Sequence, residues 1–322
     1  KRVKGTIINK FRGDVSILKP GLRMLEEKIN TSVLGVIPYF HLDIEDEDSL
    51  TERFRKKSRS GLAKIAVIRL PRISNFTDIA PLEAVDELDV SYVSNISQFG
   101  DPDVVIIPGS KNTISDLLWM RQNGLEGKIL RHAAKGGIVF GICGGYQMLG
   151  QSISDPTGAE QKGTVRGMGL LPVTTVFEQE KRRTRVSGRF AKVGGALAEM
   201  SGVCYEGYEI HMGRTVLSKG TVPLVYMEEE GEQRQDGAQS DHVYGCYMHG
   251  IFDMSETVKT FLAAVLRKKG IDPSKITVRD RNAYKEEQYD RLASIVRENL
   301  NMEAVYKIIE KGNEASCSLL SE

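Results

Sequence analysis

Cys143 is the residue whose surroundings most clearly indicate chemistry. It stands in the segment 141–145, Gly-Ile-Cys-Gly-Gly, directly after the apolar run 137–141 and before a helix predicted from Tyr146. A thiol at such a strand-to-helix turn is presented as a nucleophile, because the glycines leave room for the backbone and for a substrate. The helix start favours the thiolate, and the backbone N–H of Gly144 can donate to an oxyanion. The alternative, a structural cysteine in a glycine-rich turn, is less favoured at this junction.

A cysteine nucleophile needs a general base, and the chain offers 5 histidines. His249 follows the short apolar run 244–248 and precedes Gly250, so its side chain can face a cleft at a strand end. His211, within 207–215, is the other candidate. The pattern favours His249 and leaves His211 open. The remaining histidines are His41, His132 and His242.

The elements around these residues alternate between strands and helices. The predicted strands are 65–71, 88–93, 103–109 and 137–141, and the predicted helices are 113–123, 128–134, 146–149 and 257–268. This alternation is typical of a doubly wound α/β domain with a parallel sheet. Thr113 is expected to cap its helix. Within 165–250 the pattern predicts only shorter strands, such as 186–190 and 222–227.

The beginning of the chain predicts a separate unit. It contains a strand at 5–9, a helix at 19–29 that Pro20 begins, and an apolar strand at 33–38. Within 43–60, acidic residues give way to basic ones, which is typical of a solvated linker. We therefore place a domain boundary there.

The end of the chain predicts a helix at 289–311, followed by a small, polar and frayed tail at 312–322. The predicted organisation is a first unit with its linker at 1–60 and a main domain at 61–311, followed by that tail.

Composition narrows the classes of function. Lys and Arg number 44 and Asp and Glu 43, a net charge of +1, which excludes a generic nucleic-acid binder. No run approaches the roughly 18 apolar residues of a membrane span, and no signal-like apolar run opens the chain, so a reducing cytoplasm is predicted. The cysteines show no CxxC spacing, which predicts neither a metal site nor a disulfide framework. Cys204 and Cys246 are expected to be core thiols.

The segment 141–150 resembles the nucleophile motif of class I glutamine amidotransferase domains, in the form found in the cobyric acid synthase family. Further stretches are similar to motifs of that family and follow in the same order. They are 9–14, Asn-Lys-Phe-Arg-Gly-Asp; 71–78, Pro-Arg-Ile-Ser-Asn-Phe-Thr-Asp; 108–113 with Asp116 and Leu117; 207–213, Gly-Tyr-Glu-Ile-His-Met-Gly; and 247–253, Tyr-Met-His-Gly-Ile-Phe-Asp. The resemblance runs from about Lys4 to Lys311.

The resemblance implies a flavodoxin-like, doubly wound amidotransferase fold, preceded by the C-terminal piece of a P-loop domain of the dethiobiotin synthetase type. The chain contains no G-x-x-x-x-G-K-[ST] run, and it begins with Lys1 rather than Met. We therefore expect it to be the C-terminal portion of a longer enzyme that uses ATP and Mg, with no cofactor in the amidotransferase domain itself. Asn9 would lie where the P-loop fold recognises adenine.

The resemblance also implies a reaction. Cys143 would attack the side-chain amide of L-glutamine and form a γ-glutamyl thioester, with His249 moving the protons. The oxyanion and substrate would be held by Gly144 together with Gly109, Ser110 and Gln147. The full-length enzyme would use the ammonia and ATP to amidate the b, d, e and g carboxylates of its corrinoid substrate, adenosylcobyrinic acid a,c-diamide.

One feature departs from the wider amidotransferase pattern. Most class I members carry His-x-Glu, whereas the residue two after His249 is Ile251. Glu209, His211 and Asp253 are the candidates for supporting the imidazole.

Two alternative functions stay open: a related amidotransferase acting on cobyrinic acid or a cell-wall lipid precursor, and a non-catalytic α/β module.

Overall fold

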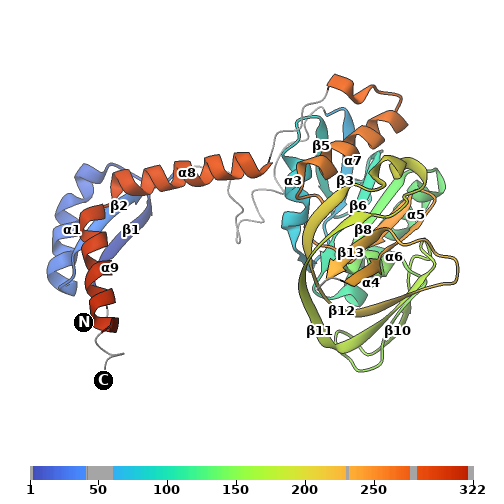
Figure 1. Ribbon diagram of the computed structural model, residues 1–322, viewed down its shortest axis with the longest axis horizontal. Coiled ribbons are helices and arrows are strands. Elements are labelled where there is room, and N and C mark those ends of the chain that lie inside the picture. The colour runs from blue at the N-terminus through green and yellow to red at the C-terminus, as the bar shows by residue number, and fades with distance from the viewer. Residues whose placement is uncertain (1–2, 41, 43–60, 230–231, 276–280, 318–322) are drawn as a thin grey trace. The chain divides into compact units, whose positions relative to one another are not determined.

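A computed structural model describes residues 3–40, 42, 61–229, 232–275 and 281–317. The chain divides into two compact units (Figure 1). The first contains Lys1–Asp46 and Asn282–Glu322, and the second contains Glu47–Arg281. The sequence prediction differs, because it grouped 61–311 as one domain. The predicted linker at 43–60 and His41 lie outside the described residues.

The main sheet of the second unit has six strands in the order β15-β16-β8-β6-β3-β5. They are β3 (Ala63–Ile68), β5 (Leu88–Val93), β6 (Val104–Ile107), β8 (Ile138–Ile142), β15 (Ala238–Ser240) and β16 (Val243–Cys246). All are parallel except β15, which pairs antiparallel at one edge. Every residue of β6 and β8 is buried, as expected for central strands covered on both faces. The predicted doubly wound α/β fold is confirmed.

Helices connect and cover these strands. They are α3 (Ala80–Glu83), α4 (Thr113–Gln122), α5 (Leu125–Ala134), α6 (Gly144–Leu149) and α7 (Ser255–Lys268), with 3-10 turns η1 (Phe76–Ile79), η2 (Gly195–Met200) and η3 (Pro273–Lys275). The cap of α4 is Asn112 rather than Thr113, because the Asn112 side chain accepts the Ser115 N–H at 3.0 Å. None of the helices in the described part of the chain is long and apolar enough to cross a membrane.

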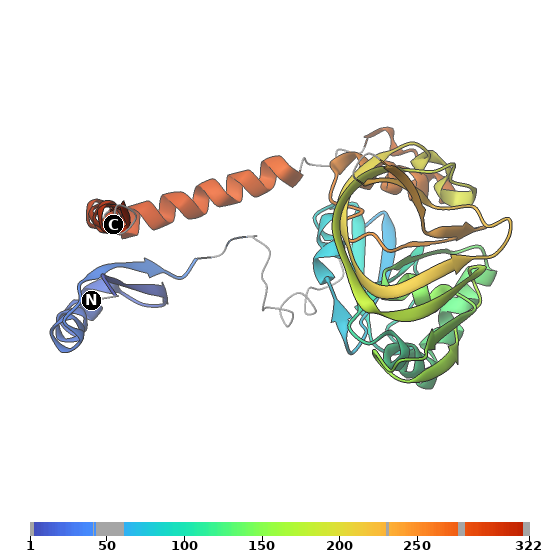
Figure 2. The same ribbon diagram turned by 60° about the horizontal axis from the view of Figure 1, so that its bottom comes forward.

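A second sheet packs beside the first. It contains β9 (Ser152–Asp155), β10 (Gly163–Arg166), β11 (Val173–Phe190), β12 (Cys204–Leu217), β13 (Val225–Glu229) and β14 (Glu232–Asp236). The prediction of only short strands here is wrong, because β11 runs for 18 residues and pairs antiparallel with the 14 residues of β12. Figure 2 shows these two long strands curving together.

A two-stranded ladder links two loops that the sequence treated separately. β4 (Ile73–Ser74) pairs antiparallel with β7 (Gly109–Ser110), and η1 follows β4 directly. The motif 71–78 is therefore held by backbone pairing next to the segment that follows β6.

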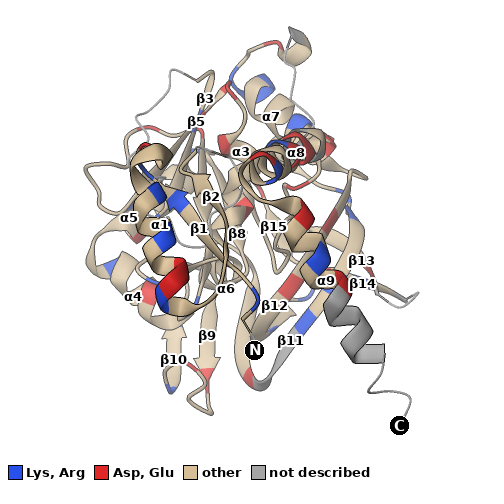
Figure 3. Ribbon diagram, turned by 90° about the vertical axis from the view of Figure 1, so that its left-hand side faces the viewer, with Lys and Arg blue, Asp and Glu red and all other residues tan. Residues whose placement is uncertain are grey.

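The first unit contains β1 (Thr6–Phe11), α1 (Val15–Ile29), β2 (Val33–Pro38), α8 (Arg281–Asn299) and α9 (Met302–Cys317). Pro20 lies inside α1 and does not begin it, because Asp14 caps the helix by accepting the Ser16 N–H at 2.8 Å. The single predicted helix at 289–311 is broken where Asn301 N donates to Leu34 O at 2.7 Å. Helix α9 continues to Cys317, into the expected tail. Charges of both signs are mixed along α8 and α9 (Figure 3).

Candidate active site

Cys143 occupies the sharp turn between β8 and α6. Its backbone angles, φ 51° and ψ −108°, lie where L-amino acids are rarely found, and such strain is typical of functional turns. Gly145 makes the turn feasible, because a Cβ there would lie 2.0 Å from the carbonyl oxygen of Ile107. Cys143 is 7% exposed, and its Sγ lies 3.7 Å from the carbonyl oxygen of Ile210. The turn therefore holds the thiol in a defined place.

The residues predicted to hold the oxyanion meet where β7 passes the start of α6. A Cβ added to Gly144 would lie 2.9 Å from the backbone nitrogen of Ser110, so the two backbones are in contact. Ser110 Oγ in turn donates to Asp116 Oδ2 at 2.7 Å, which fixes β7. Burial raises the pKa of Asp116, and the bond from Ser110 counteracts that rise. Gly109, Ser110 and Gly144 thus lie together.

His249 is buried beside Cys143 and is oriented by an aspartate. Its Nδ1 donates to Asp78 Oδ2 at 2.7 Å, and the backbone N–H of Gly250 donates to Asp78 Oδ1 at 2.9 Å. Burial alone would lower the pKa of His249, but hydrogen bonds with Asp78 and Cys143 raise it to about 10. His249 can therefore carry a proton at neutral pH and deliver it to a leaving group.

Asp78 is the functional residue that the sequence reasoning missed. Glu209 and Asp253 were the expected partners of the imidazole, yet the Nδ1 bond of His249 goes to a residue 171 positions earlier in the chain. Asp253 is exposed, and its N–H closes the turn after His249 by donating to Gly250 O at 2.8 Å. The sequence did contain a signal for Asp78, because the motif 71–78 ends on this residue. The sequence analysis used that motif only for the family resemblance and gave Asp78 no role.

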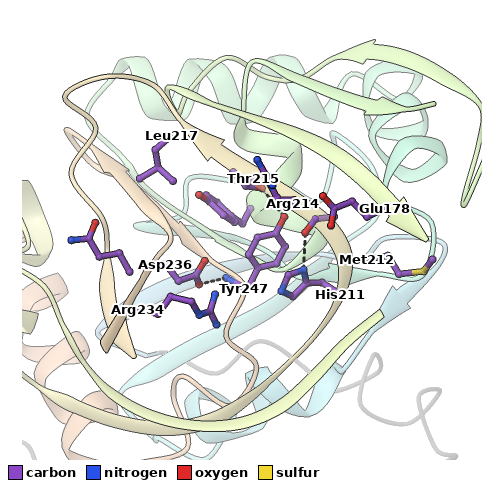
Figure 4. A pocket seen from close by; sticks show the side chains of 12 residues that line it. Glu178, His211, Met212, Arg214, Thr215, Leu217, Arg234, Asp236 and Tyr247 are labelled. Atoms are coloured by element: carbon purple, nitrogen blue, oxygen red, sulfur yellow. Dashed lines mark hydrogen bonds between the residues drawn. The ribbon is translucent and has the colours of Figure 1, made fainter. Parts of the chain in front are cut away.

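Glu209 and His211 belong to a second group of polar side chains, the Glu209 cluster. Glu209 is fully buried and accepts from Arg234 Nη2 at 2.5 Å, while its other oxygen lies 3.8 Å from His211 Nε2. His211 Nδ1 donates to Gly213 O at 2.8 Å, and its ring stacks on Tyr247 with centroids 3.7 Å apart. His211, Arg234 and Tyr247 line a cavity of about 360 Å³, and Figure 4 shows their side chains around it.

Gln147 is buried between the two groups of side chains. Its Oε1 accepts from Thr113 Oγ1 at 3.1 Å, and its Nε2 donates to the Tyr247 hydroxyl at 3.1 Å. These bonds tie α6 to α4 and to the residue that follows β16. A part for Gln147 in binding substrate stays a prediction.

The other predicted residues lie away from this chemistry. Cys246 is fully buried, and burial raises the pKa of its thiol well above the ordinary value. The prediction that Cys204 is a core thiol is wrong, because it alternates with the buried Tyr205 on β12 and is exposed. Asn9 is exposed on β1, where its Oδ1 accepts the Lys10 N–H at 2.9 Å. Within the described ranges, no group of His, Cys, Asp and Glu is arranged to hold a metal ion.

A cysteine on a strand-to-helix turn, beside a buried histidine bonded to an aspartate and a backbone loop, is typical of α/β enzyme domains that use a thiol nucleophile. Residues 64–257 match the family described as the CobB/CobQ-like glutamine amidotransferase domain. The chain belongs to this family.

Curated relatives extend the match over nearly the whole chain. Cobyric acid synthase from Ruminiclostridium cellulolyticum is 55% identical over 318 residues, which cover 98% of this chain and 62% of the relative. Cobyric acid synthase from Lachnoclostridium phytofermentans is 45% identical over 324 residues, covering 96% of this chain and 63% of the relative. The chain thus spans less than two thirds of these relatives. Among solved structures, PurLQS from Thermotoga maritima matches 64% of this chain and 99% of its own, at 17% identity and a TM-score of 0.48.

Proposed function

We propose that this chain hydrolyses the side-chain amide of L-glutamine. Cys143 Sγ attacks the amide carbon, and the charge that develops on the carbonyl oxygen is stabilised by backbone N–H groups near Gly144 and Ser110. His249 takes the thiol proton on attack and, as the carbon–nitrogen bond breaks, gives it to the nitrogen, which leaves as ammonia. His249 then deprotonates a water molecule whose oxygen attacks the thioester carbon; the carbon–sulfur bond breaks, glutamate is released, and His249 returns the proton to the thiolate.

The observation that carries this proposal is the 2.7 Å bond between His249 Nδ1 and Asp78 Oδ2, next to the strained Cys143. Because Asp78 holds Nδ1 as a donor, the other ring nitrogen is left to exchange a proton with the thiol. The missing His-x-Glu glutamate therefore does not leave the imidazole unoriented.

For the longer protein, we propose cobyric acid synthase activity in the cytoplasm. The support is the name of the relatives that match 98% and 96% of this chain. The ammonia released here would serve ATP-dependent amidation of the b, d, e and g carboxylates of adenosylcobyrinic acid a,c-diamide. The same names favour this acceptor over cobyrinic acid or a cell-wall lipid precursor.

We propose that ATP and Mg bind to a part of the enzyme that corresponds to the region of the relatives outside the match. The chain contains no phosphate-binding P-loop sequence. The hydrogen bond of Asn9 to Lys10 N is local and makes no nucleotide cradle. The residues of this chain therefore do not fit a complete ATP site, and no step above passes through the nucleotide.

Labelling with the glutamine analogue 6-diazo-5-oxo-norleucine tests the proposed glutaminase. We expect one adduct, on Cys143, together with loss of glutamate release from glutamine. The Cys143→Ala variant should stay unlabelled, and the buried Cys246 should remain unmodified in the folded protein. A folded wild-type chain that neither labels at Cys143 nor releases glutamate would refute the proposal.

A further inference from the structure

We infer that Tyr208, anchored by Asn75, is a positioning residue that holds the ring of His249 in its working orientation. The inference rests on the proposed glutaminase and assigns a role to two residues that neither bind glutamine nor exchange protons in that scheme. It is carried by contacts on a face of the imidazole that Asp78 does not reach.

The first contact is a stack of the two rings. Their centroids lie 5.3 Å apart with 24° between the planes. The two backbones are joined as well: Tyr208 N donates to His249 O at 3.1 Å, and His249 N donates to Tyr208 O at 2.9 Å. Such a mutually bonded antiparallel pair places both side chains on the same side, so the stack follows from the backbone pairing.

The second contact fixes the tyrosine itself. Asn75 Nδ2 donates to the Tyr208 hydroxyl at 2.5 Å. Asn75 has left-handed backbone angles, φ 52° and ψ 44°, a conformation that asparagine tolerates better than most residues. This turn begins η1, which carries Asp78 three residues later. One short segment therefore supplies both the anchor of Tyr208 and the carboxylate on His249.

The third side of the imidazole is closed by backbone. A Cβ added to Gly109 would lie 3.1 Å from His249 Cε1, which shows how closely β7 approaches the ring edge. Asp78 restrains the ring in its plane, Tyr208 covers one face, and Gly109 limits the edge. Rotation of the imidazole is thus restricted by three elements distant in sequence, and a catalytic group held in this way loses rate when it is displaced by about 1 Å.

The stack also acts on charge. An aromatic face within about 6 Å of a cation stabilises that cation. The Tyr208 ring should therefore favour the protonated form of His249, in the same direction as Asp78. Removing the ring should lower the pH at which the imidazole loses its proton.

The experiment compares Tyr208→Leu, which removes the ring, with Tyr208→Phe, which keeps the stack but loses the bond to Asn75. Asn75→Gly removes the same bond without straining the left-handed backbone. Tyr226→Phe on β13 is the matched control. For each variant, kcat and KM for glutamine are measured, together with the pH dependence of Cys143 alkylation by iodoacetamide.

We expect Tyr208→Leu to lower kcat by about 30- to 100-fold, the cost of a displaced catalytic group, with KM changed by less than about 3-fold. The alkaline limb of its alkylation profile should move to lower pH. Tyr208→Phe and Asn75→Gly should each lower kcat by about 3- to 10-fold, and the double variant should be no slower than the slower single, since both remove one shared bond. Tyr226→Phe should match the wild type.

Two results would overturn the inference. One is a kcat and an alkylation profile in Tyr208→Leu that both equal those of the wild type. The other is a raised KM with unchanged kcat, which would make Tyr208 a substrate contact. If Tyr208→Leu fails to fold, Tyr208→Phe and the double variant decide. Because alkylation needs no glutamine, an inactive wild type would refute the proposed function while the profile still tests Tyr208.

Discussion

Two histidines of the second unit lie beside carboxylates, the buried His249 and the partly buried His211, and we propose proton transfer for only one of the two pairs. His249 Nδ1 lies 2.7 Å from Asp78, whereas His211 Nε2 lies 3.8 Å from Glu209. Alternation along β12 separates the two regions, because Tyr208 covers His249 while the next residue, Glu209, points into the other cluster. Proximity to a carboxylate therefore does not make a histidine a base. What does so is a bond at Nδ1 that leaves the second nitrogen to a nucleophile.

The electrostatics of the two regions differ in the same sense. Burial opposes the charge of Glu209, but His211 and Arg234 together lower its pKa. Burial and the nearby charge of Glu209 raise the pKa of Asp236 to about 6. In the Glu209 cluster, the charge of Glu209 is compensated by Arg234 and His211. In the Asp78–His249 pair, the bond at Nδ1 leaves the other ring nitrogen of His249 for Cys143. We interpret the first region as structural and the second as catalytic.

The largest expected effect compares the two histidines. His249→Ala should lower the rate of glutamate release by about 10³-fold or more, since it removes the general acid and base. His211→Ala should keep the rate within about 10-fold of the wild type. Steady-state glutaminase assays on variants with unchanged circular dichroism make the comparison. An equal loss in both variants would break the distinction drawn above.

A smaller effect compares the two carboxylates. Asp78→Asn should lower kcat by about 10²-fold, because an amide can present its N–H to Nδ1 and select the wrong imidazole tautomer. Glu209→Gln, the matched amide replacement, should change kcat by less than about 5-fold and instead lower the free energy of unfolding by about 1–3 kcal/mol. Kinetics and urea unfolding of the same preparations separate these outcomes. A kinetic defect confined to Glu209→Gln would reverse the assignment.

The smallest effect concerns Asp236 and pH. Its folded pKa of about 6 lies above the ordinary value of 3.8, so the folded chain holds this proton more tightly than the unfolded chain. The stabilisation is complete below about pH 4 and is lost as the pH rises through 6, a change of at most about 3 kcal/mol. Asp236→Asn should therefore unfold at higher urea than the wild type at pH 8, and at a similar urea concentration near pH 4.

The exposed Asp101→Asn serves as the control for that measurement. It should not alter the difference between pH 4 and pH 8. Lower stability of Asp236→Asn at pH 8 would mean that ionised Asp236 is a favourable partner in the Glu209 cluster, and the contrast with the catalytic pair would weaken.

Local patterns were enough to predict the central strands of the main sheet, and they singled out Cys143 and His249 as the proposed nucleophile and base. Buried strands such as β6 and β8 are continuous apolar runs, and the consecutive glycines after Cys143 indicate the turn. His249 could be favoured because a strand and a glycine flank it. Each of these signals lies within a few residues of the group it predicts.

What could not be predicted depends on pairing between distant segments. Asp78 reaches His249 only because β4 pairs with β7 and starts the η1 turn at the right place. The sequence analysis chose Glu209 as a candidate instead, but the partner of Glu209 is Arg234, which lies 25 residues away on another strand. The long β11 and β12 were read as fragments, because charged and glycine residues interrupt their apolar pattern. Their stability comes from pairing with each other.

The backbone conformation of Cys143 lowers the stability of the fold at the position proposed to carry out the reaction. A non-glycine residue held at φ 51° and ψ −108° opposes folding by about 1–3 kcal/mol, and glycine would adopt these angles with little cost. The residue that makes the turn reactive is therefore one without which the chain would fold more favourably. Selection or engineering for thermal tolerance alone would favour glycine at this position, whereas selection for turnover would retain the cysteine.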